Sequence, residues 1–141
     1  MAEGPVVVCS AFLKRGERYL LVYAPYFNED GFWRVPGGRV EGQEHAEETL
    51  AREMQEELNI KIKVKKFLGF GQDYVYVQPV QQKKARIVLY FECEALGGEL
   101  KMDKHEITDH KWVTLEEIKK IKKLEPAMQD FFKQEVSKCL R

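Results

Sequence analysis

The sequence predicts an α/β domain in which helices cover a mixed β-sheet. Runs rich in β-branched and aromatic residues alternate with segments whose apolar residues recur every three or four positions, and tight turns join several of the strand-like runs. The chain has 141 residues, of which 44% are hydrophobic. Because a chain of this size is long enough for one core and short for two, we expect a single domain over residues 1–141.

The first part of the chain predicts a β-hairpin, a loop and a turn. Residues 5–14 are rich in valine and typical of a strand, and a turn around Gly16 leads to a second strand over residues 19–23. A loop over residues 24–32 is expected next. It is followed by Pro36-Gly37-Gly38, where we expect the chain to turn.

The middle of the chain predicts one helix followed by strands. Ala46, Leu50, Met54 and Leu58 recur at four-residue steps and indicate a helix over residues 45–58. Strands are expected over residues 60–77, with an interruption near residues 69–71, over residues 85–95 and over residues 107–113.

Two helices are expected at the end of the chain. Thr114 and Glu117 form a capping box that opens the first of them. Pro126 suits the first turn of the second, because proline there lacks only an N–H that the helix does not use. Its apolar stripe comprises Met128, Phe131, Phe132, Val136 and Leu140.

Composition excludes several classes of protein. Basic and acidic residues both number 23, so no net charge draws the chain to nucleic acid or to a membrane surface. Cys9, Cys93 and Cys139 form no CxxC pair, which argues against a disulfide framework or a zinc site and favours inert thiols. No secretory leader or spanning apolar run is evident, so we expect a cytoplasmic protein without a membrane segment.

The predicted helix over residues 45–58 carries a cluster of carboxylates. At about 100° per residue, Glu53, Glu56 and Glu57 fall within an arc of about 100° that flanks the apolar stripe. Like charges at these spacings cost about 0.2–0.5 kcal/mol per pair, and the only cation near them is Arg52, at the edge of the cluster. A divalent cation would neutralise such a cluster. The alternative is an ordinary solvated acidic face.

The residues around this cluster resemble the Nudix box, G-x5-E-x7-R-E-U-x-E-E-x-G-U, in which U is aliphatic. The glycine position alone departs from it, since Asn59 stands there, and asparagine is the usual second choice for a left-handed residue that ends a helix. The matching positions are Gly38, Glu44, Arg52, Glu53, Met54, Glu56, Glu57 and Ile60.

The resemblance extends beyond the box. Residues 33–38, WRVPGG, are similar to the approach to the box in MutT-like members, and residues 112–118, WVTLEEI, are similar to the ending of many members. The resemblance implies a Nudix-type α/β/α sandwich with a mixed β-sheet, in which the box forms a catalytic loop–helix–loop. This agrees with the segments expected from the residue patterns alone.

The resemblance also implies metal ligands. Glu53, Glu56 and Glu57 match the carboxylates that bind Mg²⁺, or Mn²⁺, in the family, and we expect Glu53 and Glu57 to contribute most. The backbone carbonyl of Gly37 is a candidate further ligand. Carboxylates with room for water and phosphate oxygens are what Mg²⁺ prefers.

Arg52 and Glu44 match box positions with supporting roles. Arg52 is expected to orient a carboxylate by hydrogen bonds, with direct contact to a phosphate as the alternative. Glu44 is expected to support the loop and the metal site from behind the ligands. The general base varies in the family between a box glutamate and one on a remote loop, and the candidates outside the box are Glu41, Glu99 and Glu106.

Candidates for binding the substrate lie on both sides of the box. We expect Gly38, Arg34, Arg39 and Tyr76 to contact it. Basic residues that would meet phosphates also include Lys83, Lys84 and Arg86, against the alternative of a solvated basic hairpin. Aromatic rings that would stack on a base, or else fill the core, are Phe27, Phe32, Tyr74 and Tyr76.

The expected function is Mg²⁺-dependent hydrolysis of a pyrophosphate bond in a nucleoside diphosphate linked to another group: a nucleoside triphosphate, a dinucleoside polyphosphate, ADP-ribose or a nucleotide sugar. The proline marker of ADP-ribose cleavage is not evident, while Tyr76 lies near where dinucleoside polyphosphate hydrolases carry a tyrosine. The alternatives are a non-catalytic nucleotide-binding or regulatory module and a structural acidic helix without metal. The expected partner is a small nucleotide, without stable nucleic acid or membrane, and the oligomeric state is left open.

Overall fold

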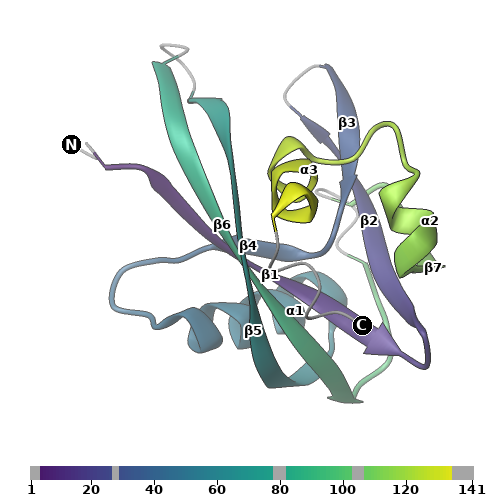
Figure 1. The fold of residues 1–141 in the computed structure, drawn as a ribbon. Coiled ribbons are helices and arrows are strands. Elements are labelled where there is room, and N and C mark those ends of the chain that lie inside the picture. The colour runs from purple at the N-terminus through teal and green to yellow at the C-terminus, as the bar shows by residue number, and fades with distance from the viewer. Residues whose placement is uncertain (1–3, 27–28, 78–81, 103–106, 135–141) are drawn as a thin grey trace.

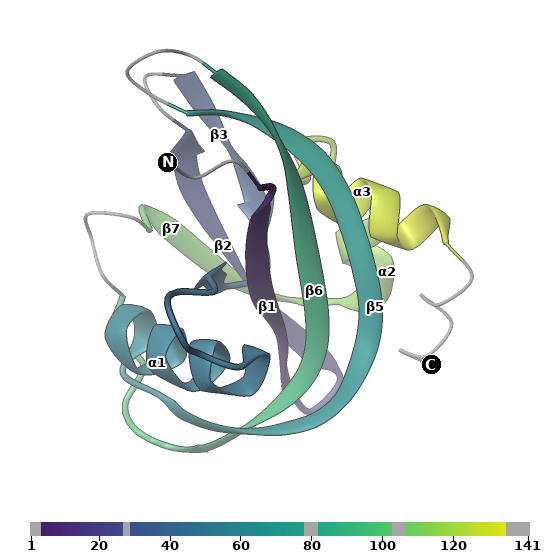
Figure 2. The same cartoon turned by 90° about the vertical axis from the view of Figure 1, so that its left-hand side faces the viewer.

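The computed structural model describes residues 4–26, 29–77, 82–102 and 107–134. A mixed β-sheet forms its middle layer, with one long helix against one face and two shorter helices against the other (Figures 1 and 2). This is the α/β/α sandwich that the sequence predicted. The elements are β1 (Val6–Arg15), β2 (Arg18–Tyr26), β3 (Glu29–Arg34), β4 (Gly37–Arg39), α1 (Ala46–Leu58), β5 (Lys61–Val77), β6 (Gln82–Gly97), β7 (Asp109–Thr114), α2 (Leu115–Lys119) and α3 (Pro126–Lys133).

The sheet is mixed because two strands far apart in the chain run in parallel at its centre. The strand order is β3-β2-β1-β6-β5, with β4 and β7 paired to β1 and β2. β1 and β6 are parallel, so Val8 lies opposite Val88, whereas the other pairs are antiparallel. β4 therefore holds the beginning of the box, Gly38 and Arg39, beside the central strand.

Successive side chains of β1 point to opposite faces and divide the core into two halves. Phe12 packs with α2 and α3, while Leu13 packs with α1. The α1 half contains Leu50, Met54 and Leu58, all with an exposed fraction of 0%. Burial of each such side chain contributes about 1.5–3 kcal/mol, so this apolar stripe holds the polar face of α1 in place.

The predicted left-handed end of α1, capping box of α2 and first-turn proline of α3 are confirmed, whereas the hydrogen bond that opens α1 was not predicted. The N–H of His45 donates to the Glu48 carboxylate at 2.8 Å at the start of α1, and Asn59 ends that helix with a left-handed φ of 59°. Thr114 and Glu117 cap α2 reciprocally. Pro126 occupies the first turn of α3. Val136 and Leu140, predicted to extend the stripe of α3, lie outside the described residues.

Two expectations about the chain before the box were wrong. Gly37 and Gly38 lie in β4 rather than in a turn, because they pair with β1, and the turn comes later, at Gly42 with φ 48°. β2 and β3 occupy most of the expected loop, because their backbones pair as a hairpin, with Ala24 opposite Phe32.

β5 is irregular where the sequence predicted an interruption. Its register with β6 shifts between Phe67 and Gly69. Beyond the shift, α3 lies against β5: the N–H of Gln72 donates to Asp130 Oδ2 at 2.9 Å, and Gln134 Nε2 donates to the Phe70 carbonyl at 2.8 Å. The last helix thus contacts the backbone of the final strand of the sheet.

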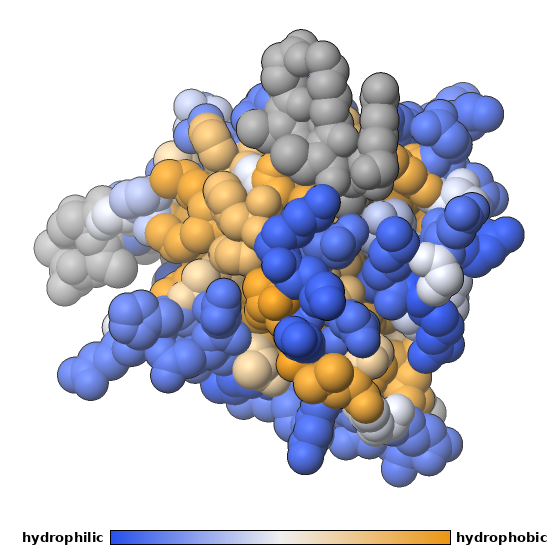
Figure 3. Space-filling view, turned by 60° about the horizontal axis from the view of Figure 1, so that its bottom comes forward, coloured by the Kyte–Doolittle hydropathy of each residue, from blue (hydrophilic) through white to orange (hydrophobic). Residues whose placement is uncertain are grey.

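The surface carries both apolar and polar areas. Viewed from below the orientation of Figure 1, hydrophobic areas are interrupted by bands of hydrophilic side chains (Figure 3). Among the residues whose side chains are described, the exposed large apolar ones are Phe67, Phe70, Tyr74 and Leu96. None of the described helices is long and apolar enough to cross a membrane.

Candidate functional site

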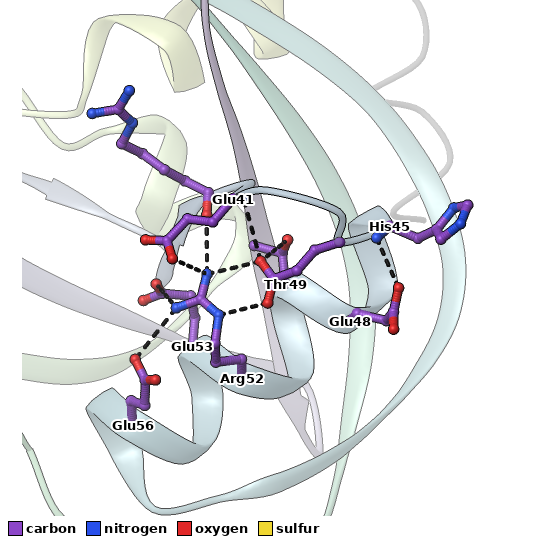
Figure 4. Close-up of polar contacts among 9 residues, drawn as sticks. Glu41, His45, Glu48, Thr49, Arg52, Glu53 and Glu56 are labelled. Carbon is purple, nitrogen blue, oxygen red and sulfur yellow. Dashed lines mark hydrogen bonds and ion pairs between the residues drawn. The ribbon is translucent and has the colours of Figure 1, made fainter.

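Arg52 lies at the centre of the carboxylates that the box brings together (Figure 4). Its Nε donates to Glu44 Oε2 at 2.7 Å and its Nη2 to Glu44 Oε1 at 3.0 Å. Its Nη1 donates to Glu53 Oε1 at 2.9 Å and to Glu56 Oε2 at 3.3 Å. Arg52 thus contacts Glu53 and Glu56 of the predicted cluster, and the sequence did not predict that Glu44 folds back onto the helix and holds the guanidinium from the other side.

Glu44 accepts two further hydrogen bonds. Its carboxylate accepts hydrogen bonds from Thr49 Oγ1 at 3.0 Å and from the N–H of Glu41 at 3.3 Å. Arg52 also donates to the carbonyl of Arg39 at 3.1 Å, which links the helix to β4. The hydrogen bonds from Arg52 lower the pKa of Glu44 to about 2, with Thr49 and Glu41 adding to the effect. Glu44 is thus ionised near neutral pH and links the loop before α1 to the helix through its hydrogen bonds.

Thr49 was not among the residues expected at the site. It is fully buried on α1 and its hydroxyl reaches Glu44. A signal was present, because threonine stands between polar Glu48 and apolar Leu50 at a boundary of the helix wheel. Its partner could not be read from that position alone.

Glu53 and Glu57 lie one turn apart on the side of α1 that faces β4. The side chain of Glu53 is 13% exposed, and Glu57 as a residue is 5% exposed. Burial raises the pKa of Glu53, while the hydrogen bond and charge of Arg52 oppose the rise and a hydrogen bond with Glu57 also lowers it. Two neighbouring carboxyl groups are thus held away from bulk water, an environment that favours a bound cation or proton.

Gly38 is in contact with this pair. A Cβ at Gly38 would overlap the carboxyl group of Glu53, so any side chain there would displace the glutamate. A Cβ at Gly37 would overlap the carbonyl of Cys9 and the Cα of Ser10 on β1. Both positions therefore require glycine: the Glu53 carboxyl group occupies the place of a side chain at Gly38, and the backbone of β1 occupies it at Gly37.

The three box glutamates differ in how deeply their side chains are buried. Glu56 is 61% exposed at its side chain and is bound to Arg52, whereas Glu53 and Glu57 are held inward. Within the described ranges, no three acidic, histidine or cysteine side chains stand together as a ready metal site. Glu53 and Glu57 thus form an inward pair, and Arg52 Nη1 links the exposed Glu56 to Glu53.

The candidates for contact with substrate lie in different environments. Arg39 is exposed on β4, next to the Arg52 network. Arg34 is half-buried, and its Nη1 donates to the Val35 carbonyl at 3.3 Å. Tyr76 pairs with Lys83 through the backbones of β5 and β6, and its side chain is outside the described part.

The remaining candidates differ in what the structure shows of them. Tyr74 is 64% exposed, with Lys83 Nζ lying 4.1 Å from its ring centroid, and Phe32 is half-buried. Glu41 is exposed and lies 3.9 Å from Arg52. Glu99 is exposed. Phe27 and Glu106 fall outside the described residues.

Arg86 was expected as a possible phosphate contact, and the structure contradicts this. Its guanidinium forms two hydrogen bonds with Asp73, at 2.8 and 2.7 Å, and lies 2.9 Å from Glu125 Oε2. The side chains of Asp73 and Glu125 are each 8% exposed. Both carboxylates therefore engage Arg86 inside the fold, on the α3 face of the sheet.

This buried charge network was not predicted. The Tyr90 hydroxyl contacts Glu125 Oε1 at 3.4 Å, and burial raises the pKa of Tyr90 well above its ordinary value. The N–H of Ala127 donates to Asp73 at 3.1 Å, so the network anchors the first turn of α3 to β5. Asp73 and Arg86 are cross-strand partners, but that register is not apparent from the sequence.

The described cysteines are the inert thiols that the sequence predicted. Cys9 and Cys93 are fully buried and form no disulfide. Burial raises the pKa of Cys9 to about 11 and that of Cys93 to about 12, so both stay neutral thiols near neutral pH. Cys139 lies outside the described residues.

Comparison with solved structures places the fold among MutT proteins. The MutT protein of Methanosarcina mazei Go1 is 25% identical, with a TM-score of 0.75, and the match covers 94% of each chain. A MutT NUDIX hydrolase from Burkholderia pseudomallei is also 25% identical, with a TM-score of 0.73, and the match covers 94% of this chain and 99% of that one.

Sequence relatives point to the same family. An ADP-ribose pyrophosphatase of Methanocaldococcus jannaschii is 32% identical over 98 residues, which are 69% of this chain and 55% of the relative. An NAD-capped RNA hydrolase NudC of Mannheimia succiniciproducens is 30% identical over 118 residues, or 79% of this chain and 41% of the relative. The chain thus spans about half of the length of these curated relatives.

A sequence profile of the NUDIX domain matches residues 4–134, which include every element described above. The match therefore covers the box, the strand that leads into it and the final helix. The chain belongs to the Nudix family of hydrolases.

Proposed function

We propose that this protein hydrolyses a pyrophosphate bond in a nucleoside diphosphate linked to a second group, with Mg²⁺ or Mn²⁺ as its cofactor. The observation that carries the proposal is the inward-facing pair Glu53 and Glu57, with the Glu53 carboxyl group lying directly against the backbone of Gly38. The Nudix family implies a nucleotide-type substrate and a divalent metal. Neither is specified more closely by the fold.

The donor set fits a magnesium ion. Mg²⁺ dehydrates reluctantly and is usually held by one or two carboxylates, with water and substrate phosphates completing its coordination. Glu53 and Glu57 would supply the carboxylates, with Glu56 and the carbonyl of Gly37 as further candidate ligands. When bound, the metal would polarise a phosphoryl oxygen, neutralise the diphosphate and lower the pKa of a coordinated water.

The chain's own residues would orient the ligands and the substrate. Arg52 holds Glu53 through Nη1 while Glu44 holds Arg52 from the other side, so the carboxylate orientation depends on two charge-assisted contacts. Arg39 and Arg34 are the proposed contacts for the phosphates, and Tyr76 for the remainder of the substrate. A carboxylate would take the proton of the attacking water, with Glu41, Glu99 and Glu106 as the candidates outside the box.

The relatives narrow the choice of second group without deciding it. One is named an ADP-ribose pyrophosphatase and another an NAD-capped RNA hydrolase, and both names describe a diphosphate that carries a nucleoside. We therefore propose to test first those nucleoside diphosphates whose terminal phosphate is linked to a second group.

A substrate panel tests the proposal. Nucleoside triphosphates, diadenosine polyphosphates, ADP-ribose, NAD⁺ and nucleotide sugars are incubated with Mg²⁺ and separated by chromatography. At least one should yield a nucleoside monophosphate together with a second phosphorylated product or pyrophosphate. A positive reaction run in ¹⁸O-water should place the label on phosphorus. Label on carbon, or activity confined to phosphate monoesters, would contradict the proposal. If none of the substrates in the panel is hydrolysed, a non-catalytic binding module is favoured.

A further inference from the structure

Asn59 ends α1, and its side chain joins two segments of the chain. Its backbone is left-handed, with φ 59° and ψ 38°, a conformation that glycine accepts as readily. The amide Nδ2 donates to the carbonyl of Glu99 at 3.0 Å, and Oδ1 accepts from Gln55 Nε2 at 3.0 Å. Glycine, which the Nudix box has here, would provide the backbone conformation without either hydrogen bond.

The segment over residues 98–102 lies directly against the end of α1. The N–H of Lys101 donates to the Leu58 carbonyl at 3.0 Å. Gly98 has φ +105°, and a Cβ there would overlap the carbonyl of Asn59. Leu100 and Met102 pack on the same core half as α1. The backbones of α1 and of residues 98–102 are therefore already in contact, and the hydrogen bond from the Asn59 amide adds a side-chain link between them.

This link connects two parts of the proposed reaction. Glu57 lies two residues before Asn59 and Glu53 one turn earlier, so the proposed metal ligands move with the end of the helix. Glu99, a candidate general base, is the residue whose carbonyl the amide holds. Misplacement of a catalytic group by about 1 Å can slow a reaction by about 100-fold, so a fixed distance between these parts matters.

We propose that Asn59 is a positioning residue that fixes the segment bearing Glu99 to the helix bearing the metal ligands. The proposal rests on the proposed function, since it assigns the segment a part in the same hydrolysis. Asn59 acts through Glu99 and its neighbours and does not itself touch the substrate. The backbone turn alone does not require asparagine, because glycine forms it.

Two variants remove the link and leave the left-handed turn. Asn59→Gly deletes the amide, and Asn59→Asp keeps the size of the side chain but replaces the donor with an oxygen that repels the Glu99 carbonyl. Gln55→Ala is the matched control, because it removes the other hydrogen bond of the same amide from an exposed position one turn earlier. Each variant is compared with wild type for kcat, KM and the hydrogen exchange of amides 98–102 in the metal-free protein.

We expect both Asn59 variants to lower kcat by about tenfold or more, with KM within about twofold, and to accelerate exchange at residues 99–101. Gln55→Ala should match wild type in all three. In a double-mutant cycle, Asn59→Gly should cost little once Glu99→Gln is present, because the two changes remove one function. Wild-type kcat and exchange in Asn59→Gly, or losses that multiply in the cycle, would overturn the proposal.

Failure of the proposed function gives a different pattern. If wild type hydrolyses nothing in the panel, the catalytic role of Asn59 falls with it, whatever the exchange rates show. If wild type is active and exchange accelerates in Asn59→Gly while kcat is unchanged, the link is structural only and the positioning role alone is refuted.

Discussion

The guanidinium of Arg52 and the carboxylate of Glu44 form a paired contact, with Nε to Oε2 at 2.7 Å and Nη2 to Oε1 at 3.0 Å. The contact joins the loop before α1 to the middle of that helix. Since Arg52 also binds Glu53, the loop and a proposed metal ligand share one cation.

Replacement of Arg52 by lysine should slow hydrolysis much more than it unfolds the protein. Lysine keeps the charge but loses the planar fork that binds Glu44 twice and Glu53 once. We expect kcat to fall by about 10-fold to 100-fold, and stability to fall by about 1 kcal/mol or less because Arg52 is partly exposed. Arg18→Lys, in the exposed pair with Glu117, is the control and should change neither. Equal activity of the two variants would refute the role of the fork.

Glu44 should make stability depend on acid in a defined range. Its pKa is lowered from 4.5 to about 2, chiefly by Arg52, so the ionised form stabilises the fold above pH 4.5. That contribution is lost as the pH falls toward about 2. Urea unfolding of wild type and Glu44→Gln from pH 6 to pH 2 should show a difference in free energy that narrows across this range. A difference that stays constant would show that the ionised carboxylate has no such partner.

Glu57→Gln should abolish turnover and leave the fold intact. Glutamine keeps the size of the side chain but removes the charge proposed to hold Mg²⁺, and neutral glutamine is easier to bury at a site that is 5% exposed. We expect kcat to fall by orders of magnitude, with a melting temperature equal to or slightly above that of wild type. Glu48→Gln, exposed on the same helix, should retain full activity. Full activity of Glu57→Gln, or of wild type in EDTA, would remove these glutamates from the metal site.

The end of α1 should tolerate glycine and reject a β-branched residue. At φ 59° a valine is strained, whereas glycine is not. We expect Asn59→Val to lose about 1–2 kcal/mol or more relative to Asn59→Gly in chemical denaturation. Equal stability of the two variants would mean that the helix does not end in a left-handed residue.

Removal of Arg86 should destabilise the fold strongly. Arg86→Met leaves Asp73 and Glu125 buried without their cation, which should cost about 3–5 kcal/mol. Lys83→Met on the same strand is the exposed control and should cost far less. Combining Arg86→Met with Asp73→Asn and Glu125→Gln should recover part of the loss. A triple variant less stable than Arg86→Met alone would contradict the assigned cause.

The sequence predicted what depends on neighbours along the chain. The apolar spacing of α1, the capping box at Thr114 and the left-handed residue at Asn59 are local features, and all are confirmed. The α/β/α sandwich followed from a resemblance carried by the box, not from the residue patterns alone. The box also singled out Arg52, Glu44 and the paired glutamates by their spacing.

What the sequence missed depends on contacts between distant segments. Gly37 is extended because it pairs with Ser10, which no local pattern reveals. Arg52 contacts Glu44 only because the loop folds back onto the helix, which the spacing along the chain does not reveal. Asp73 and Arg86 pair only in one register of β5 and β6, and the sequence alone does not determine that register. The burial of Glu57 likewise follows only when α1 has docked on the sheet.

The contacts between α3 and β5 bear on how the protein behaves when concentrated. β5 is the last strand on the path through the sheet, and such a border offers backbone groups to which a foreign strand can attach. Asp130 accepts a hydrogen bond from the N–H of Gln72, and Gln134 donates one to the carbonyl of Phe70. Two exposed aromatic residues of the same strand, Phe67 and Tyr74, lie close by in the sequence. These contacts from α3 and its C-cap residue therefore oppose the pairing of β5 with a strand of another molecule, next to exposed aromatic side chains that would favour such association.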